Sequence, residues 1–211
     1  MRKVTFGGAC SVDNFFARED GSVDWLMWSD EVTELMKEFW PRVDCLVMGR
    51  KTYDVALKMI PSAESTSPPA ESTTPSAEAA GTPPLKTGDP EPEPKLVNPY
   101  GDMKTYVFSR TLEAGERNGV EFVAEEAGEF VGRLKAQEGK EICVMGGGEL
   151  AHSLLEAGVI DEIGLNIQPV LLGSGIPVLH KMSRQIDLEL IESKTLKNGC
   201  VYVLYRTKES N

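Results

Sequence analysis

Short apolar runs alternate with helical patterns along most of this chain. The helical pattern is clearest after Ser29, where four apolar residues within positions 32–39 recur at the i, i+3, i+4, i+7 spacing of one helix face. Ser29 is a residue type that caps helix N-termini. Weaker patterns predict helices starting near Thr52 and running over residues 129–137 and 149–157.

The apolar runs are short, rich in β-branched residues or bounded by turn residues, so they read as strands. They cover residues 4–10, 45–48, 105–108, 120–123, 141–145, 163–167, 188–193 and 200–205. Lys197-Asn198-Gly199, between the last two runs, is a hairpin turn signal. The order predicts an α/β fold: a mixed, mainly parallel sheet with a C-terminal antiparallel hairpin and flanking helices.

Residues 61–95 interrupt this alternation. They consist mainly of Pro, Ser, Thr, Ala and Glu, and nine of the thirteen prolines fall there. Such a composition cannot bury enough apolar surface to offset its ordering entropy, so we expect a disordered insertion within a single domain of residues 1–211. A lid over the active site is the alternative interpretation.

Composition restricts the classes of function. The net charge of −11 and the pI near 4.8 argue against a nucleic-acid or anionic-membrane surface. The sequence has no apolar run of about 18 residues and no signal-peptide pattern, so a cytoplasmic protein is expected. The four cysteines are widely spaced and show no ligand spacing with either histidine, so no metal site is predicted.

Two glycine-containing segments are the candidates for chemistry. In one, the apolar run ending at Met145 leads through Gly146, Gly147 and Gly148 into a helix. Backbone N–H groups can approach a ligand closely there, and the helix N-terminus favours a phosphate. A plain strand-to-helix turn is the alternative. The second segment, residues 47–52, has a similar strand-to-helix position.

The segments together resemble the dihydrofolate reductase superfamily, and more closely its riboflavin-biosynthesis reductase domain. The resemblance extends from Arg2 to about Arg206, with the insertion as the large departure. The similar segments are Ser11-Val12-Asp13-Asn14, Gly21-Ser22-Val23-Asp24-Trp25-Leu26, Met48-Gly49-Arg50-Lys51-Thr52, Val107-Phe108-Ser109-Arg110-Thr111, Gly146-Gly147-Gly148-Glu149-Leu150 and Pro169-Val170-Leu171-Leu172-Gly173. The resemblance implies a dihydrofolate-reductase-like three-layer fold.

The resemblance also implies NADPH as cofactor. The cofactor-binding residues that it assigns are Gly49, Arg50, Thr52, Ser109, Arg110, Gly146, Gly147, Gly148, Glu149 and Leu150. Arg110 is the candidate for the 2′-phosphate, because its fork of donors fits that group. Glu149 departs from the basic residue that dihydrofolate reductases often carry there.

Three carboxylates are candidates for the catalytic acid. Dihydrofolate reductases place the acid shortly after a tryptophan on the first long helix, and that window holds Asp30 and Glu31. Both also suit a helix start for dipole reasons alone. Riboflavin reductases implicate the aspartate of the first segment, here Asp13, for which a turn role is the alternative.

The functional prediction is an NADPH-dependent reductase acting on a pteridine-like or other small heterocyclic substrate. A stand-alone reductase of the riboflavin pathway is one alternative, although Met145 replaces the usual glutamate and Asn14 the usual glycine. A nucleotide-binding protein without catalysis is the other. Related reductase domains form two-fold dimers, so a homodimer is expected; the apolar side chains between Ile163 and Leu172 could contribute to it or to the core.

Overall fold

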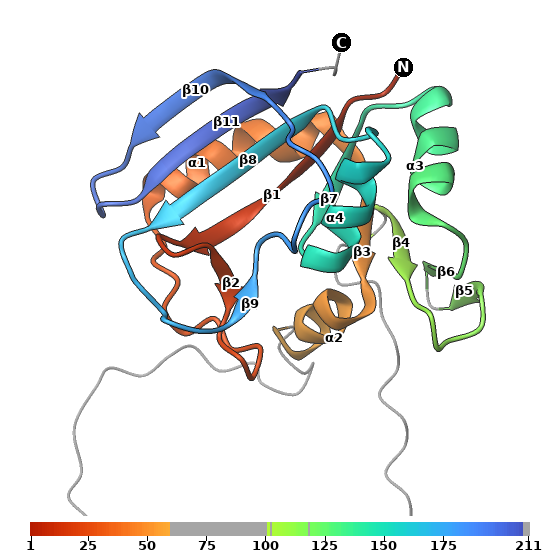
Figure 1. Cartoon of the computed structure of the whole chain (residues 1–211), viewed down its shortest axis with the longest axis horizontal. Helices are drawn as coiled ribbons and strands as arrows, with labels where there is room; N and C mark the ends of the chain where they lie inside the picture. The colour runs from red at the N-terminus through yellow and green to blue at the C-terminus, as the bar shows by residue number, and fades with distance from the viewer. Residues whose placement is uncertain (60–100, 102, 118, 209–211) are drawn as a thin grey trace, which may run out of the picture.

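The computed structural model describes residues 1–59, 101, 103–117 and 119–208, and its centre is a sheet of nine strands (Figure 1). Two further short strands form a separate pair. The strands are β1 Val4–Ser11, β2 Phe15–Ala17, β3 Val43–Gly49, β4 Lys104–Phe108, β5 Gly115–Arg117, β6 Val120–Val123, β7 Glu141–Met145, β8 Glu162–Gln168, β9 Ile176–Pro177, β10 Leu188–Thr195 and β11 Val201–Thr207. The predicted insertion, residues 61–95, lies outside the described residues.

The order of strands in the large sheet is β10-β11-β8-β1-β7-β3-β4-β6-β5. The strands from β8 to β6 run parallel, whereas β11, β10 and β5 pair antiparallel with their neighbours. β2 and β9 form the small second sheet. This arrangement confirms the predicted mixed, mainly parallel sheet with an antiparallel C-terminal hairpin.

Helices cover both faces of the sheet, which makes three layers (Figure 1). α3 Ala127–Ala136 and α4 Gly148–Glu156 pack with Phe6, Ile142 and Val144 in one apolar core. α1 Asp30–Phe39, the 3₁₀ turn Trp40–Arg42 and α2 Arg50–Met59 lie over the other face. Two cores on opposite faces of one sheet explain why the central strands are nearly all apolar.

Local signals account for several helix boundaries. The Ser29 hydroxyl accepts a hydrogen bond from the Val32 N–H at 3.3 Å and caps α1, as predicted. α3 begins two residues before the predicted position, because the Glu126 carboxylate accepts from Gly128 and Glu129 N–H and acts as its cap. The short strands β2, β5 and β9 were not predicted; each has two or three residues, too few to show a period.

The four cysteines are buried and free within the described part of the chain. Burial raises the pKa of the Cys10 and Cys45 thiols to about 11 and that of Cys143 to about 12. Thiols with such pKa values are protonated at neutral pH and act as small apolar groups. None of the described helices is both long and apolar enough to cross a membrane.

Candidate active site

The parallel strands bring the predicted site residues to one edge of the sheet. β3 ends at Gly49, β4 at Phe108 and β7 at Met145, each directly before predicted residues. These strands and β1 run parallel, so their carboxyl ends share one edge. Ligands of open α/β sheets bind outside the carboxyl ends of strands where the chain reverses its direction across the sheet. In this sheet the reversal occurs at β1, because β3 and β4 lie on one side of it and β8 lies on the other.

The loop after β7 lies directly against the start of α2. Gly146 and Gly147 have φ values of 57° and 76°, which favour glycine. A Cβ on Gly146 would lie 3.0 Å from the Thr52 hydroxyl oxygen, and one on Gly147 would lie 3.6 Å from the Gly49 nitrogen. The structure therefore brings Gly146 and Gly147 against Thr52 and Gly49, which lie 94 and 98 positions earlier in the sequence.

Gly148 has a different reason to be glycine. A Cβ there would lie 2.6 Å from the Pro177 carbonyl oxygen and 3.2 Å from that of Val178. The segment around β9 thus packs against the first turn of α4. Val178 N–H also donates to the Asn14 carbonyl at 3.0 Å, which links this segment to the end of β1.

The N-terminus of α4 suits an anion. Its N-cap is Gly147, which has no side chain to accept from the first-turn N–H groups. Those groups and the helix dipole place partial positive charge at the loop. Leu150 is 7% exposed and its side chain belongs to the core, so this side chain is not available to a ligand.

Two other predicted cofactor residues have partners within their own segments. The Arg50 guanidinium donates from Nε to Asp54 Oδ1 at 2.6 Å along α2. The buried Ser109 hydroxyl accepts from the N–H groups of Thr111 at 3.3 Å and Leu112 at 3.1 Å, which fixes the turn after β4. That turn leaves Arg110 exposed, and its guanidinium pairs with Glu149 across the edge at 2.7 Å.

The Asp13 carboxylate joins the loop after β8 to the end of β1. It accepts from the N–H groups of Leu172 at 3.1 Å and Gly173 at 2.7 Å. A hydrogen bond from Ser11 and these backbone donors lower its pKa below the ordinary value of 3.8. Asp13 is therefore ionised at neutral pH. Asn14 has φ of 69°, a left-handed backbone conformation that asparagine adopts more readily than most other residues with a side chain.

The two carboxylates at the start of α1 lie at the same edge of the sheet, because β11 begins beside the end of β8, but away from the glycine loop. Glu31 accepts from the Lys197 N–H at 2.8 Å in the β10–β11 turn. In the sheet order, β8 and β1 separate β11 from β7. Asp30 is exposed in the first turn of α1, where the helix dipole stabilises a carboxylate.

The structure adds an exposed backbone position in β1, Gly8, that the sequence analysis did not single out. β1 pairs with β7 only as far as Gly7 and Met145, while it continues along β8 to Ser11. Gly8, just past that point in the centre of the sheet, is exposed. The available signal was the run Gly7-Gly8-Ala9, because glycine inside a strand marks close approach of another group.

On the other face of β1 and β8, the oxygens Thr5 Oγ1 and Asn166 Oδ1 are two of the five buried side-chain polar atoms that have no hydrogen-bond partner among the described residues. The Asn166 side chain lies beside Ala9 in the register of β8 and β1, on the face opposite Leu165, Ile167 and the core that contains α3 and α4. Its Oδ1 atom is buried and has no hydrogen-bond partner in the described structure. A buried acceptor of this kind is costly unless a ligand supplies a donor.

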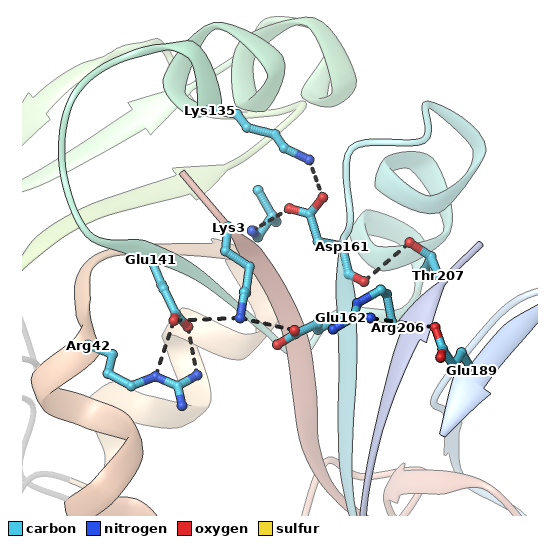
Figure 2. A network of polar contacts seen from close by, with 10 residues as sticks. Lys3, Arg42, Lys135, Glu141, Asp161, Glu162, Glu189, Arg206 and Thr207 are labelled. Carbon is cyan, nitrogen blue, oxygen red and sulfur yellow. Dashed lines mark hydrogen bonds and ion pairs between the residues drawn. The ribbon is translucent and has the colours of Figure 1, made fainter. Parts of the chain in front are cut away.

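A cavity of about 1090 Å³ lies at the opposite edge of the sheet, among the starts of β1 and β8 and the end of β11. Figure 2 shows the polar contacts there: Lys3 bridges Glu141 and Glu162, and Lys135 pairs with Asp161. Asp161 also accepts from the Val4 N–H at 2.8 Å. These groups neutralise one another and join the strand ends, so we place the candidate site at the carboxyl edge.

Comparison with known proteins agrees with this fold. The family model described as the RibD C-terminal domain matches residues 2–202. The uncharacterized protein YwjB of Bacillus subtilis is 30% identical over 194 residues, which cover 92% of this chain and 91% of YwjB.

Two solved structures show the same fold at low sequence identity. A crystal structure of a putative riboflavin biosynthesis protein from Shewanella sp. PV-4 has a TM-score of 0.66 and 22% identity, covering 99% of this chain and 100% of its own. Dihydrofolate reductase from Enterococcus faecalis, solved as a complex with NADP(H), has a TM-score of 0.60 and 12% identity, covering 98% and 97%.

Proposed function

The chain belongs to the RibD C-terminal domain family, and on that premise we propose that it is a reductase that transfers hydride from NADPH to a small heterocyclic substrate. The observation that supports this most directly is the arrangement at the carboxyl edge. A glycine loop without a side-chain cap, the start of α2 and the exposed Arg110 lie around one helix N-terminus. NADPH is suited by these three features: close backbone approach, helix N–H groups for the pyrophosphate and a cation for the 2′-phosphate.

Each group has a role in this proposal. The N–H groups at the start of α4 hold the pyrophosphate, with Gly49 and Thr52 completing the wall against Gly146 and Gly147. Arg110 binds the 2′-phosphate. A bound dinucleotide would supply the hydride, and the exposed backbone of Gly8, just past the end of the β1–β7 pairing, would lie beside it.

The substrate lies, in this proposal, on the α1 side of the end of β1. Asn166 Oδ1 accepts from an N–H group of the substrate ring, which provides the hydrogen bond that this buried atom lacks. Asp13, ionised and bonded to Leu172 and Gly173, orients the loop after β8 and does not donate the proton. We assign the proton to water, because Asp13 is ionised, the Glu31 carboxylate accepts from the Lys197 N–H and Asp30 is exposed at the start of α1.

The relative named for riboflavin biosynthesis supports the riboflavin-pathway reductase as a second candidate. The test is therefore consumption of NADPH with two substrates, dihydrofolate and 5-amino-6-(5-phosphoribosylamino)uracil. Turnover of either compound supports a reductase and selects the substrate class. Binding of NADPH without hydride transfer to a broad panel of heterocycles would instead indicate a nucleotide-binding protein without catalysis.

Arg110→Ala tests the cofactor assignment. A charge-assisted hydrogen bond contributes about 1.5–3 kcal/mol, so NADPH binding should weaken by roughly tenfold or more while NADH binding changes little. Calorimetric titration measures both. Arg206→Ala is the matched control, because Arg206 also forms an exposed pair with a glutamate but lies at the opposite edge. An unchanged NADPH/NADH ratio in Arg110→Ala removes Arg110 from the 2′-phosphate role.

A further inference from the structure

The Arg110–Glu149 pair joins two segments that both belong to the proposed cofactor site. Arg110 follows β4, and Glu149 lies in the first turn of α4, directly after the glycine loop. Their side chains are 88% and 65% exposed, and Arg110 Nη2 donates to Glu149 Oε2 at 2.7 Å. Solvent exposure on both sides means that burial does not fix this pair, so a ligand can compete with it.

The carboxylate of Glu149 disfavours binding of the cofactor that carries a 2′-phosphate. A 2′-phosphate that approaches Arg110 must displace Glu149 or share the guanidinium with it, and it carries up to two negative charges. Glu149 therefore weakens binding of the 2′-phosphate in two ways: it occupies the cation, and it repels the anion.

The same carboxylate favours binding of the cofactor without a 2′-phosphate. A ribose without the 2′-phosphate presents a 2′-hydroxyl group, which can donate a hydrogen bond to a carboxylate. In dinucleotide sites generally, an acidic residue accepts from the ribose 2′-hydroxyl, while a nearby arginine accommodates the 2′-phosphate. This chain holds both residue types within hydrogen-bond distance of one another.

We infer that Glu149 is a specificity-determining residue that lowers the preference for NADPH over NADH by holding the Arg110 side chain. The inference rests on the proposed function. The inference broadens the class of cofactor, because the protein then binds dinucleotides with either a 2′-phosphate or a 2′-hydroxyl. The ratio of the two affinities is set by one exposed ion pair.

The experiment is calorimetric titration of Glu149→Gln and the unchanged protein with NADPH and NADH, and with the fragments 2′,5′-ADP and 5′-AMP. Glutamine keeps the size of the side chain and removes its charge. The expected result is about five- to tenfold tighter binding of NADPH and 2′,5′-ADP, as removal of one exposed charge contact allows. NADH and 5′-AMP should bind equally well or slightly more weakly.

Glu189→Gln is the matched control. Glu189 is 54% exposed and pairs with Arg206 at 3.5 Å, so its substitution changes the net charge equally but at the opposite edge of the sheet (Figure 2). An increase for NADPH in Glu189→Gln as large as in Glu149→Gln would overturn the inference, because the effect would then come from net charge. The inference would also be overturned if Glu149→Gln bound NADPH and NADH more tightly by the same factor, or if it bound NADPH no more tightly than the unchanged protein.

The two proposals fail in different ways. If the unchanged protein bound neither dinucleotide, the proposed function would be wrong, and the inference with it. If it bound both and Glu149→Gln left their ratio unchanged, the proposed function would stand and only the inference would be wrong. Raising the salt concentration should shrink the difference between the two proteins, because exposed charges are screened.

Discussion

Single residues at the carboxyl edge differ in how strongly the fold uses them. Asp13 and Ser109 each accept two backbone N–H groups and hold a turn. Arg110 and Glu149 contact each other at the surface, and Asn166 has a buried oxygen without a partner. Residues of the first kind should affect folding when replaced, and those of the second kind should affect binding.

Asp13→Ala tests the first kind. The variant should unfold at a lower temperature at pH 7, because the Leu172 and Gly173 N–H groups lose a charged acceptor. The pKa of Asp13 is lowered by folding, so its stabilisation is complete above the ordinary value of 3.8 and disappears as the pH falls through the lowered value. Thermal unfolding from pH 7 to pH 2 measures this.

Asp24→Asn is the control for Asp13→Ala, because the Asp24 carboxylate pairs with the Arg18 side chain six residues away on an exposed loop, whereas Asp13 joins two distant segments. It should change the melting temperature much less. A constant difference between Asp13→Ala and the parent protein down to pH 2 would contradict the role of the Asp13 charge. Retained hydride transfer in Asp13→Asn would agree with a proton from water.

Asn166→Leu tests the second kind. Leucine has a similar size but no polar atom, so it removes a buried acceptor that has no partner. We expect unchanged or slightly increased stability, together with substrate binding weakened by about tenfold, since one hydrogen bond contributes ~1 kcal/mol or more when its partner would be left unpaired. Urea unfolding and the KM for substrate measure the two effects. A large loss of stability with unchanged KM would assign Asn166 to the fold.

At the scale of elements, glycines in two helices differ in the space available for a side chain. Gly148 begins α4 and touches the backbone around β9, whereas Gly132 lies inside α3, where a Cβ would meet only Val159 Cγ1 at 3.9 Å. The same substitution should therefore have opposite effects on the free energy of unfolding.

Gly148→Ala should lower the free energy of unfolding by about 1–3 kcal/mol, because its Cβ would overlap the Pro177 carbonyl oxygen and force backbone shifts. Gly132→Ala should raise it by up to about 1 kcal/mol, since alanine favours a helix interior. Urea unfolding of both variants measures the difference. Equal effects would show that the contact between α4 and the β9 segment is not rigid.

At the scale of the whole molecule, an apolar area remains exposed near the carboxyl edge. Val12, Met27, Trp28 and Leu171 are 59%, 41%, 72% and 70% exposed. They belong to neighbouring segments, because Val12 N–H donates to the Val170 carbonyl and Met27 N–H to the Gln168 side chain. Ile163, by contrast, is buried, and Leu165 and Ile167 pack against the same core.

The homodimer remains a prediction, and this area is the surface we expect it to use. Light scattering at micromolar concentration should give twice the chain mass of 23.1 kDa. Leu171→Glu should give the monomer mass, because a two-fold contact places each substitution in the interface twice. Leu190→Glu on β10, an exposed leucine outside this area, is the control. A monomer of the unchanged protein at high micromolar concentration would contradict the dimer.

The sequence by itself determined the helices and the longer strands and their order along the chain. The apolar stripe and the Ser29 cap specify α1, because helix period and capping depend on residues a few positions apart. Short apolar runs separated by helices specify a mainly parallel sheet, and parallel strands place their carboxyl ends at one edge. The sequence therefore indicated the edge that carries the glycine loop, Thr52 and Arg110.

The tertiary structure decided which groups meet at that edge. Asp13 bonds Leu172 and Gly173, Glu31 bonds Lys197, and Arg110 pairs with Glu149. These partners are 39 to 166 positions apart, so no local pattern encodes their contact. The exposure of Gly8 follows from the register at which β7 ends beside β1. Such contacts depend on strand order and register, which the whole chain sets through burial of both faces of the sheet.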